Sequence, residues 1–174
     1  MHRSELDTLI DAETLAARIR ALGAEISADY EGSDLVVVGI LKGSFIFLAD
    51  LVRCMTVEHA TDFLGLSSYG HGESSTGVVK ITSDLSSSIE GRDVLVVEDI
   101  IDTGLTMRYL LENLTTRKPK SVRVCTLLHK PSRSRSAVPI DYVGFTIEDH
   151  FVIGYGLDYM DKMRSVPFIG VKRS

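Results

Sequence analysis

The segment 94–106 holds the side chains of this sequence that are best suited to do chemistry. Four apolar residues precede two adjacent carboxylates, Glu98 and Asp99, and a third carboxylate, Asp102, comes three residues later. The next residues are small and polar apart from one leucine: Thr103, Gly104, Leu105 and Thr106. A short apolar run suits a buried strand, and the apolar spacing from Met107 onward is helical. The segment therefore predicts a strand, a polar loop and a helix.

Such an arrangement can bind a ligand that carries both phosphate and hydroxyl groups. Backbone N–H groups at a helix start are unpaired and lie at the positive end of the helix dipole, so they attract phosphate. Gly104 allows the backbone to come close, and Thr103 and Thr106 add hydroxyl donors. Carboxylates would repel a phosphate, but they suit sugar hydroxyls, a proton that must move, or a bridging Mg²⁺.

Two other interpretations of this segment exist. The plainer one is an acidic turn exposed to solvent, with Thr103 or Thr106 as an ordinary helix N-cap. The other is a nucleotide triphosphatase, but no Gly-x-x-x-x-Gly-Lys-Ser/Thr loop occurs in the sequence, so that class loses its main support. The whole run of acids, hydroxyls and glycine favours the ligand site.

Two lysines follow other apolar runs. Lys42 and Gly43 come directly after the run 35–41, where the backbone amides of a loop can hold a pyrophosphate; a solvated turn is the alternative. Lys130 follows the run 121–128 after one further residue and stands just before Pro131. Its three N–H donors suit a carbonyl oxygen. A surface lysine at a strand end is the simpler interpretation of Lys130.

The segment 151–159 is the second strong signal. Phe151 offers a flat face that can stack on a base, and two glycines flank Tyr155, which indicates a close backbone approach. Asp158 follows, and Arg164 lies six residues further on. The plainer alternative is an aromatic core strand followed by a solvated acid and arginine.

The stretch 67–77 is polar and rich in glycine, so we expect a mobile loop there. Ser68 and Tyr69 lie at its root. An aromatic side chain at the root of such a loop fits a lid that excludes water from a site, although most long polar loops are only loops.

Composition sets the class. The chain has 174 residues, which suits one domain, 1–174, and a net charge of −5, which argues against a nucleic-acid-binding face. Its apolar runs are too short to span a bilayer, and its first residues lack a signal region, so we expect neither membrane insertion nor export. Cys54 and Cys125 lie far apart in apolar surroundings, which predicts two buried thiols in the cytoplasm.

Apolar periodicity predicts the elements that position these groups. Asp11 can cap a helix whose apolar stripe is Leu15, Ile19, Leu22 and Ile26. A second helix, 45–55, is apolar nearly all round and is expected to be buried. Strands are expected at 35–41, 57–66, 78–82, 94–97, 121–128, 140–147, 151–155 and 167–171. The alternation predicts an α/β fold with a mainly parallel sheet, whose ligands bind beyond the carboxyl ends of the strands.

The segment 94–106 resembles the phosphoribosyl-pyrophosphate motif of the type I phosphoribosyltransferases: an apolar run, two acids, two aliphatic residues and then Asp-Thr-Gly-x-Thr. With the segments around Lys42, Lys130 and 151–159, in this order, the chain resembles the branch of that family that salvages purines. The resemblance covers residues 35–171. It implies the family fold, a mainly parallel twisted sheet flanked by helices, with a small hood near the C-terminal part.

The resemblance also implies an activity. Members of this branch transfer the 5-phosphoribosyl group from phosphoribosyl pyrophosphate to N9 of hypoxanthine or guanine, giving IMP or GMP and pyrophosphate, with Mg²⁺ as cofactor. It implies that Glu98 and Asp99 hold the ribose hydroxyls, directly or through Mg²⁺. The segment 102–106, with Leu105 in its variable slot, would cradle the 5′-phosphate, and Asp102 would exchange a proton with N7 of the purine.

On the purine, the resemblance implies that Lys130 donates to the 6-oxo group, that Phe151 stacks on the ring, and that the Val152 backbone reads the pyrimidine edge. The resemblance implies Lys42, Gly43 and Arg164 at the pyrophosphate and Asp158 at a second Mg²⁺. It implies Ser68 and Tyr69 at the lid.

Some questions stay open from sequence. The preferred base can be hypoxanthine, guanine or xanthine, and a regulator that keeps the site as a sensor is a rival class, although it should show an extra domain or a basic face. His129 and His150 have no assigned role. Family members are dimers or tetramers, so we expect one of these, with the helix 45–55 inside the domain or at an interface. Members of the family that the chain resembles often have a cis peptide at this step, and whether the peptide between Leu41 and Lys42 is cis also stays open.

Overall fold

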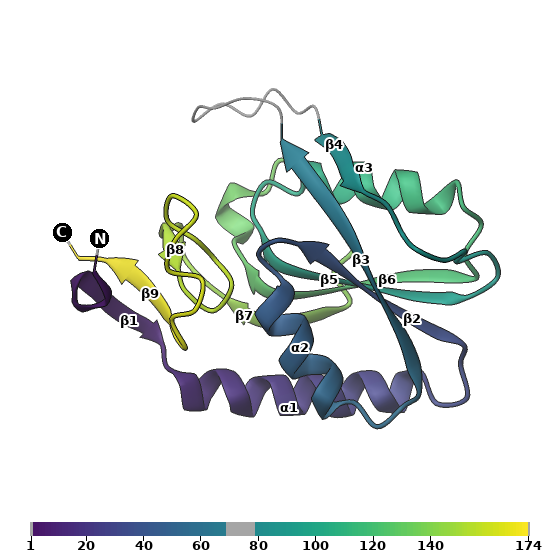
Figure 1. Ribbon diagram of the computed structural model, residues 1–174, viewed down its shortest axis with the longest axis horizontal. Coiled ribbons are helices and arrows are strands. Elements are labelled where there is room, and N and C mark those ends of the chain that lie inside the picture. Colours follow the sequence, from purple (N-terminus) through teal and green to yellow (C-terminus); the bar gives the residue numbers. More distant parts are fainter. Residues whose placement is uncertain (1, 69–78, 174) are drawn as a thin grey trace.

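A six-stranded sheet forms the centre of the molecule, with the order β4–β3–β2–β5–β6–β7. The computed structural model describes residues 2–68 and 79–173. All neighbouring strands pair in parallel except β4, which runs antiparallel to β3 (Figure 1). The expected mainly parallel sheet is therefore confirmed. Its strands are β2 (Leu35–Leu41), β3 (His59–Ser68), β4 (Val79–Ser83), β5 (Asp93–Ile101), β6 (Ser121–His129) and β7 (Tyr142–Thr146).

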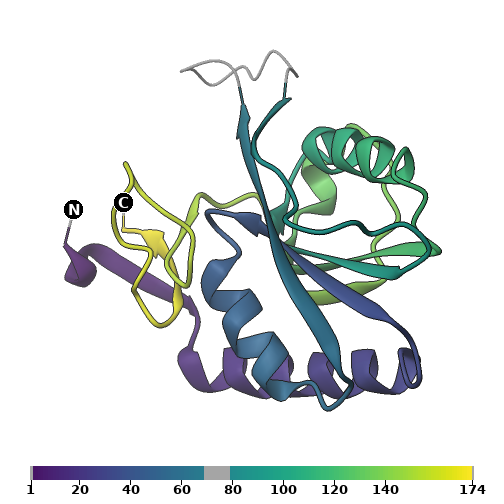
Figure 2. The same ribbon diagram turned by 45° about the vertical axis from the view of Figure 1, so that its right-hand side comes forward.

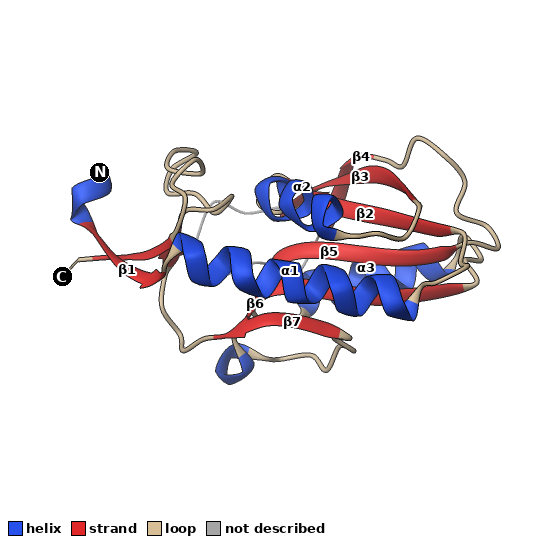
Figure 3. Ribbon diagram, turned by 90° about the horizontal axis from the view of Figure 1, so that it is seen from below, coloured by secondary structure: helices blue, strands red, loops and turns tan. Residues whose placement is uncertain are grey.

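Three helices cover the two faces of this sheet: α1 (Ala12–Asp29), α2 (Phe45–Cys54) and α3 (Leu105–Thr115). Figure 3 shows α1 and α2 on one face and α3 on the other. Val37 of β2 belongs to the core beneath α1 and α2, whereas its neighbours Val36 and Val38 belong to the core beneath α3. Because both faces are covered, β2 has no polar side chain, and neither has the run 94–97 of β5. Asp11 caps α1 as predicted, accepting a hydrogen bond from the Thr14 N–H at 2.8 Å.

A second, smaller sheet forms the hood beside the carboxyl ends of the central strands (Figures 1 and 2). It consists of β1 (Leu6–Ile10), β9 (Ile169–Lys172) and β8 (Val152–Ile153), paired antiparallel in that order. The hood was expected near the C-terminal part, but one of its strands comes from the N-terminal part. That strand was missed because only its first and last residues are buried, so it shows no alternation.

Two expected elements need correction. The helix 45–55 was predicted to be buried all round, but only Phe47, Leu48 and Leu51 are buried, and Phe45 is 43% exposed. The reason is that α2 packs on the sheet and on α1, which leaves its outer face uncovered. The strand 94–97 was expected to end at the acids, but β5 continues through them to Ile101.

The thiols of Cys54 and Cys125 are unpaired. Cys125 is fully buried, as predicted, and Cys54 is half-buried. Within the described residues, no helix is both long and apolar enough to cross a membrane.

Asp93, at the start of β5, generates a pH-dependent prediction. Its carboxylate accepts hydrogen bonds from Lys120 Nζ at 2.8 Å and from the Ser121 hydroxyl at 2.7 Å, and these bonds hold the pKa of Asp93 below its usual value. The ionised form is therefore favoured by folding, so its stabilisation is present above the unfolded pKa and is lost as the pH falls through the folded one.

We expect Asp93→Asn to lower the urea midpoint at pH 7, and the difference from wild type to shrink as the pH falls below the usual Asp range and through the lowered pKa of Asp93, where its carboxyl becomes neutral. Asp34→Asn, in the loop before β2, is the matched control, since its carboxylate is mostly exposed and pairs with Arg92. A difference between Asp93→Asn and wild type that did not change with pH would contradict the prediction.

Candidate active site

Two adjacent carboxylates lie at the carboxyl end of β5, in the centre of the sheet. Glu98 is buried, and its Oε1 accepts a hydrogen bond from the Asp99 N–H at 3.2 Å; Asp99 Oδ1 accepts from the Ile100 N–H at 2.8 Å. Burial, reinforced by the charge of Asp99, raises the pKa of Glu98 well above its usual value. Burial also raises the pKa of Asp99, against the opposing charge of Arg164. A cation or hydroxyl donors placed beside this pair would stabilise its ionised form.

The loop after β2 packs directly on this pair. The peptide between Leu41 and Lys42, whose isomer the sequence left open, is cis. A Cβ built on Gly43 would lie 1.6 Å from Asp99 Oδ2, so no larger residue fits there with the carboxylate in place. On its other side the loop touches the hood: a Cβ on Gly156 would lie 2.0 Å from the Gly43 carbonyl oxygen. Sheet, loop and hood therefore meet at Gly43.

A cluster of opposite charges surrounds that meeting point. Arg164 Nη2 lies 2.8 Å from Asp158 Oδ1, and Arg164 Nη1 donates to the Gly156 carbonyl at 2.7 Å. Lys42 Nζ lies 3.6 Å from Asp161 Oδ1, and Arg164 Nη2 lies 3.7 Å from the same oxygen. The structure thus brings together Lys42, Asp158 and Arg164, which the sequence placed in one site, and adds Asp161. The sequence gave no signal for Asp161, because an exposed acid in a polar turn looks like ordinary surface.

The loop 102–106 leads into α3. Gly104 is the N-cap, with a φ of +79° that favours glycine, so neither Thr103 nor Thr106 is the N-cap as the plainer interpretation had it. The Thr103 hydroxyl accepts from the Leu105 N–H at 3.4 Å. A hollow of about 100 Å³ lies here and another of about 250 Å³ adjoins it. Both are lined by Glu98, Ile100 and Thr106, and the larger also by Gly43, Asp99 and Ser67.

Lys130 and Asp102 lie in one cluster of charges on the other side of this loop. Lys130 is only 7% exposed, and its N–H donates to the Ile101 carbonyl at 3.0 Å. Lys130 Nζ lies 3.5 Å from Asp149 Oδ1. Arg133 Nε donates to Asp102 Oδ1 at 3.1 Å, and Arg133 Nη1 donates to Asp149 Oδ2 at 3.4 Å. The hydrogen bond to Asp102 raises the pKa of Arg133. Arg133 and Asp149 were not predicted from the sequence.

The hood contributes an exposed aromatic ring. Phe151 is 63% exposed and meets Tyr159 edge to face, with ring centroids 6.2 Å apart and planes at 81°. Val152 follows it at the start of β8 and is buried. The expected strand 151–155 is shorter than predicted, because Tyr155 adopts a left-handed φ of +49°.

The remaining sequence candidates lie at the margins. Ser68 is the last residue of β3, whereas Tyr69 and the rest of the expected lid lie outside the described residues. His150 Nε2 lies 3.5 Å from the exposed Glu148 carboxylate, and His129 ends β6 half-buried. Neither histidine joins the charge clusters described above.

The metal prediction involved Glu98, Asp99 and Asp158. Within residues 2–68 and 79–173, no group of three or more histidine, cysteine or acidic side chains is arranged to hold an ion. The donor chemistry nevertheless suits Mg²⁺, because Glu98 is buried, Asp99 is half-buried, and desolvation raises the pKa of both carboxyls. Mg²⁺ is commonly held by one or two carboxylates with the substrate supplying other oxygens.

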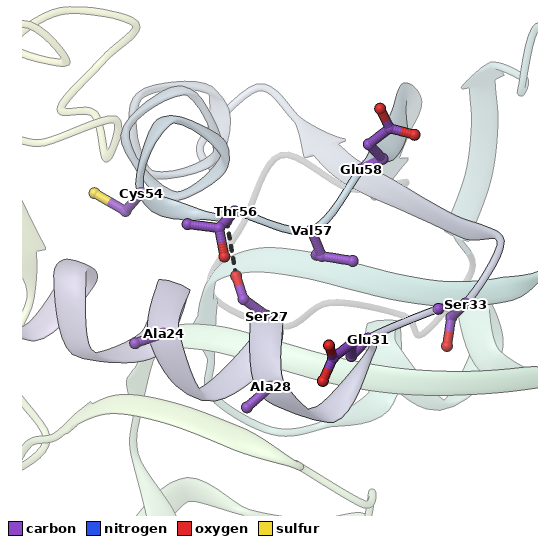
Figure 4. Close-up of a pocket in the computed structure, with 10 residues that line it drawn as sticks. Ala24, Ser27, Ala28, Glu31, Ser33, Cys54, Thr56, Val57 and Glu58 are labelled. Carbon is purple, nitrogen blue, oxygen red and sulfur yellow. Dashed lines mark hydrogen bonds between the residues drawn. The ribbon is translucent and has the colours of Figure 1, made fainter.

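A hollow of about 810 Å³ lies at the opposite end of the sheet, between the last turns of α1 and α2 (Figure 4). Its Ser27 hydroxyl accepts from the Thr56 N–H at 2.9 Å and donates to the Gly23 carbonyl at 2.6 Å. It adjoins the amino ends of β2 and β3, away from the carboxyl ends where ligands bind in such sheets. The charge clusters, and not this hollow, define the candidate active site.

The fold and this site define a class of enzyme. Residues 5–160 match the phosphoribosyl transferase domain family, so the chain belongs to that family, and the resemblance seen in the sequence is confirmed.

Particular relatives narrow this further. The chain is 50% identical over 167 residues to the hypoxanthine phosphoribosyltransferase of Escherichia coli K12, covering 95% of this chain and 94% of that protein. It is 49% identical over 168 residues to the hypoxanthine-guanine phosphoribosyltransferase of Mycobacterium avium, and the match covers 93% of this chain and 83% of that protein. The crystal structure of a hypoxanthine phosphoribosyltransferase from Staphylococcus aureus matches with a TM-score of 0.94 and 44% identity, covering 98% and 93%.

The contact between Gly43 and Asp99 generates a prediction. We expect Gly43→Ala to displace the Asp99 carboxylate and to lower phosphoribosyl transfer roughly 100-fold, the scale of a misplacement of about 1 Å at a reacting centre. Steady-state assays, normalised to folded protein by circular dichroism, measure this. The control is Gly32→Ala, where an added Cβ meets nothing within 4 Å; its φ of +73° makes alanine cost stability there, and the normalisation to folded protein accounts for that cost. Equal activity of the two variants would contradict the prediction.

Proposed function

We propose that this chain transfers the 5-phosphoribosyl group from phosphoribosyl pyrophosphate to N9 of hypoxanthine, and of guanine, forming IMP or GMP and releasing pyrophosphate. The observation that carries the proposal is the buried Lys130 ammonium, held in one charge cluster with Asp102 beyond the carboxyl ends of the central strands. The names of the relatives from Escherichia coli and Mycobacterium avium support the same substrates.

On the purine side, the Lys130 ammonium donates to the 6-oxo oxygen of the base. The exocyclic amine of adenine cannot accept that hydrogen bond, so 6-oxopurines are favoured. Asp102 takes the proton that the base sheds as N9 bonds to the ribose, working at N7 as general base. Phe151 stacks on the ring, and the Val152 backbone reads its pyrimidine edge; the exposure of Phe151 leaves its ring accessible to a base.

On the ribose side, positive charge builds on the sugar as the bond to pyrophosphate breaks. Glu98 and Asp99 hold the ribose hydroxyls and stabilise that charge by their own negative charge. The segment 102–106 binds the 5′-phosphate through the backbone N–H groups at the start of α3 and the Thr103 and Thr106 hydroxyls. The hollow lined by Asp102, Gly104 and Thr106 is the place for this phosphate.

On the pyrophosphate side, Lys42, Gly43 and Arg164 bind the leaving group. The Lys42 ammonium is paired with Asp161, and the Arg164 guanidinium is paired with Asp158 and Asp161. Glu98 and Asp99, and separately Asp158, would hold Mg²⁺, which when bound neutralises the charge of the pyrophosphate as it leaves. The sequence assigns Ser68 and Tyr69 to a lid that would keep water from hydrolysing the activated ribose, and Tyr69 lies outside the described residues.

A four-base comparison tests the assignment. With Mg²⁺ and phosphoribosyl pyrophosphate, we expect turnover of hypoxanthine and of guanine but not of adenine, followed spectrophotometrically, and loss of turnover when Mg²⁺ is chelated. Xanthine in the same assay measures the remaining preference at the 2-position. Turnover of adenine without hypoxanthine would show the assignment to be wrong.

Asp102→Asn tests the mechanism. We expect turnover to fall by roughly 10²–10⁴-fold, the usual contribution of a general base, while phosphoribosyl pyrophosphate still binds. Stopped-flow turnover and calorimetric binding measure the two quantities. Unchanged turnover would remove Asp102 from the mechanism.

We also propose a location and an assembly. The unpaired thiols of Cys54 and Cys125 fit a reducing compartment, the cytoplasm. The outer face of α2 fits a dimer or tetramer interface: Phe45 is 43% and Phe63 40% exposed, and Phe63 lies beside Leu48 of α2, since both come within 4 Å of a Cβ built on Gly39. Exposed aromatic surface of this kind is typical of a contact with a second copy.

Phe45→Glu tests the assembly. A buried unpaired charge opposes association, so we expect the variant to sediment at a lower mass than wild type at equal concentration. Ala17→Glu, on the exposed side of α1, is the control and should sediment like wild type. Equal masses for Phe45→Glu and wild type would place the interface elsewhere.

A further inference from the structure

Two side chains with purine-facing roles, Asp102 and Lys130, are joined by a bridge of two others. Arg133 Nε donates to Asp102 Oδ1 at 3.1 Å, and Arg133 Nη1 donates to Asp149 Oδ2 at 3.4 Å. Asp149 Oδ1 lies 3.5 Å from Lys130 Nζ. The four groups alternate in charge, so each one is held by a neighbour of opposite sign. The bridge runs from a residue after β5 to one after β6.

The backbone fixes the place of Arg133. It ends a single 3₁₀ turn, Pro131–Arg133, whose proline suits the first position of such a turn. The Arg133 N–H donates to the Lys130 carbonyl at 3.1 Å. The next residues are tied to the loop of Asp102, because the N–H groups of Arg135 and Ser136 donate to the Thr103 carbonyl at 3.0 and 3.1 Å. Arg133 is therefore held beside Asp102 from both sides.

The geometry leaves both purine-facing groups available. A carboxylate has two oxygens, and Arg133 engages only Oδ1 of Asp102, which leaves Oδ2 to accept from a purine N–H. The Lys130 ammonium has three N–H donors, and Asp149 is the ion-pair partner it has among the described residues. Lys130 is buried, whereas Arg133 and Asp149 are about half exposed, so the bridge lies on the solvent side of the groups that it holds.

We infer that Arg133, together with Asp149, is a positioning pair for the transfer proposed above, and the inference rests on that proposed function. N7 and the 6-oxo oxygen lie on the same edge of a 6-oxopurine. The pair sets the spacing of Asp102 and Lys130 to match these two atoms and keeps one oxygen of Asp102 turned to N7. Arg133 acts through Asp102 and does not itself touch the base.

The competing view is that these are ordinary surface ion pairs, which contribute little to stability. The two views differ in kinetics. A surface pair leaves every kinetic constant unchanged when it is removed, whereas a positioning pair changes the constants for the base and for turnover and leaves those for phosphoribosyl pyrophosphate alone.

The test uses Arg133→Ala with Arg135→Ala as matched control, since Arg135 is an exposed arginine two residues away whose side chain has no bond to the described residues. We expect Arg133→Ala to lower kcat/KM for hypoxanthine roughly ten- to a hundredfold, the effect of losing a hydrogen bond to a charged group. KM for phosphoribosyl pyrophosphate and the thermal midpoint should match the control. Arg133→Lys should recover part of the loss, because an ammonium restores the charge but not the two-pronged geometry.

Two further variants test the path of the effect. Asp149→Asn should lower kcat/KM for hypoxanthine roughly two- to fivefold, the size expected for a half-exposed ion pair. In an Asp102→Asn background, Arg133→Ala should add no further loss of turnover, because the residue on which it acts is already changed.

The outcomes separate the two levels of the argument. Wild-type protein that forms neither IMP nor GMP would overturn the proposed function and this inference with it. Wild-type activity with Arg133→Ala equal to Arg135→Ala would overturn the inference alone. So would an equal loss from Arg133→Ala in the wild-type and Asp102→Asn backgrounds, since Arg133 would then act independently of Asp102.

Discussion

The contact between Asp99 and Gly43 is the constraint on which the site depends. Asp99 is fixed by the sheet, because it lies within β5 and its carboxylate accepts from the next backbone N–H. The loop after β2 comes so close to it that no Cβ fits, and the hood turn at Gly156 comes equally close to the loop. Three segments far apart in the chain are therefore held together by two close contacts at glycines. One is with the short Asp99 side chain, and the other is between two backbones.

The second organising feature is that the site balances its own charges. Each cationic side chain proposed to bind a substrate has an acidic partner: Asp161 for Lys42, Asp158 for Arg164 and Asp149 for Lys130. The cations are thereby held in place at little cost in repulsion, but an incoming phosphate has to compete with carboxylates. A divalent cation brought in with the substrate would resolve that competition, which is a physical reason for the expected dependence on Mg²⁺.

Sequence reasoning reached the parts of the site that follow from chain order. Parallel strands gather their carboxyl ends at one edge, so the order of the apolar runs is enough to place Glu98, Lys42 and Lys130 together. It missed Arg133, Asp149 and Asp161, because half-exposed charges in turns look like solvated surface and their partners are distant in sequence. The strand Leu6–Ile10 was missed for a related reason: its three middle residues are exposed, so it lacks the alternation that identifies a half-buried strand.

The two halves of the site differ in how they are supported. The loops after β2 and β5, which we propose bind the phosphates, leave strands of the six-stranded sheet. This sheet has helices on both faces. Phe151 and Val152 belong to the hood, whose buried core is small and consists of Leu6, Ile153 and Val166. Other hood residues, Val152, Tyr155 and Ile169, belong to the main core beneath α1 and α2, and the Tyr155 hydroxyl donates a hydrogen bond to Asp50 of α2. Because β8 pairs with β9 and β9 with β1, the position of the base-stacking ring depends on residues from both ends of the chain. In the proposed mechanism the sheet therefore fixes where the phosphates bind, and the packing of the hood on the main core fixes the ring that stacks on the base. Gly156 against Gly43 is the point at which the hood meets the loop after β2.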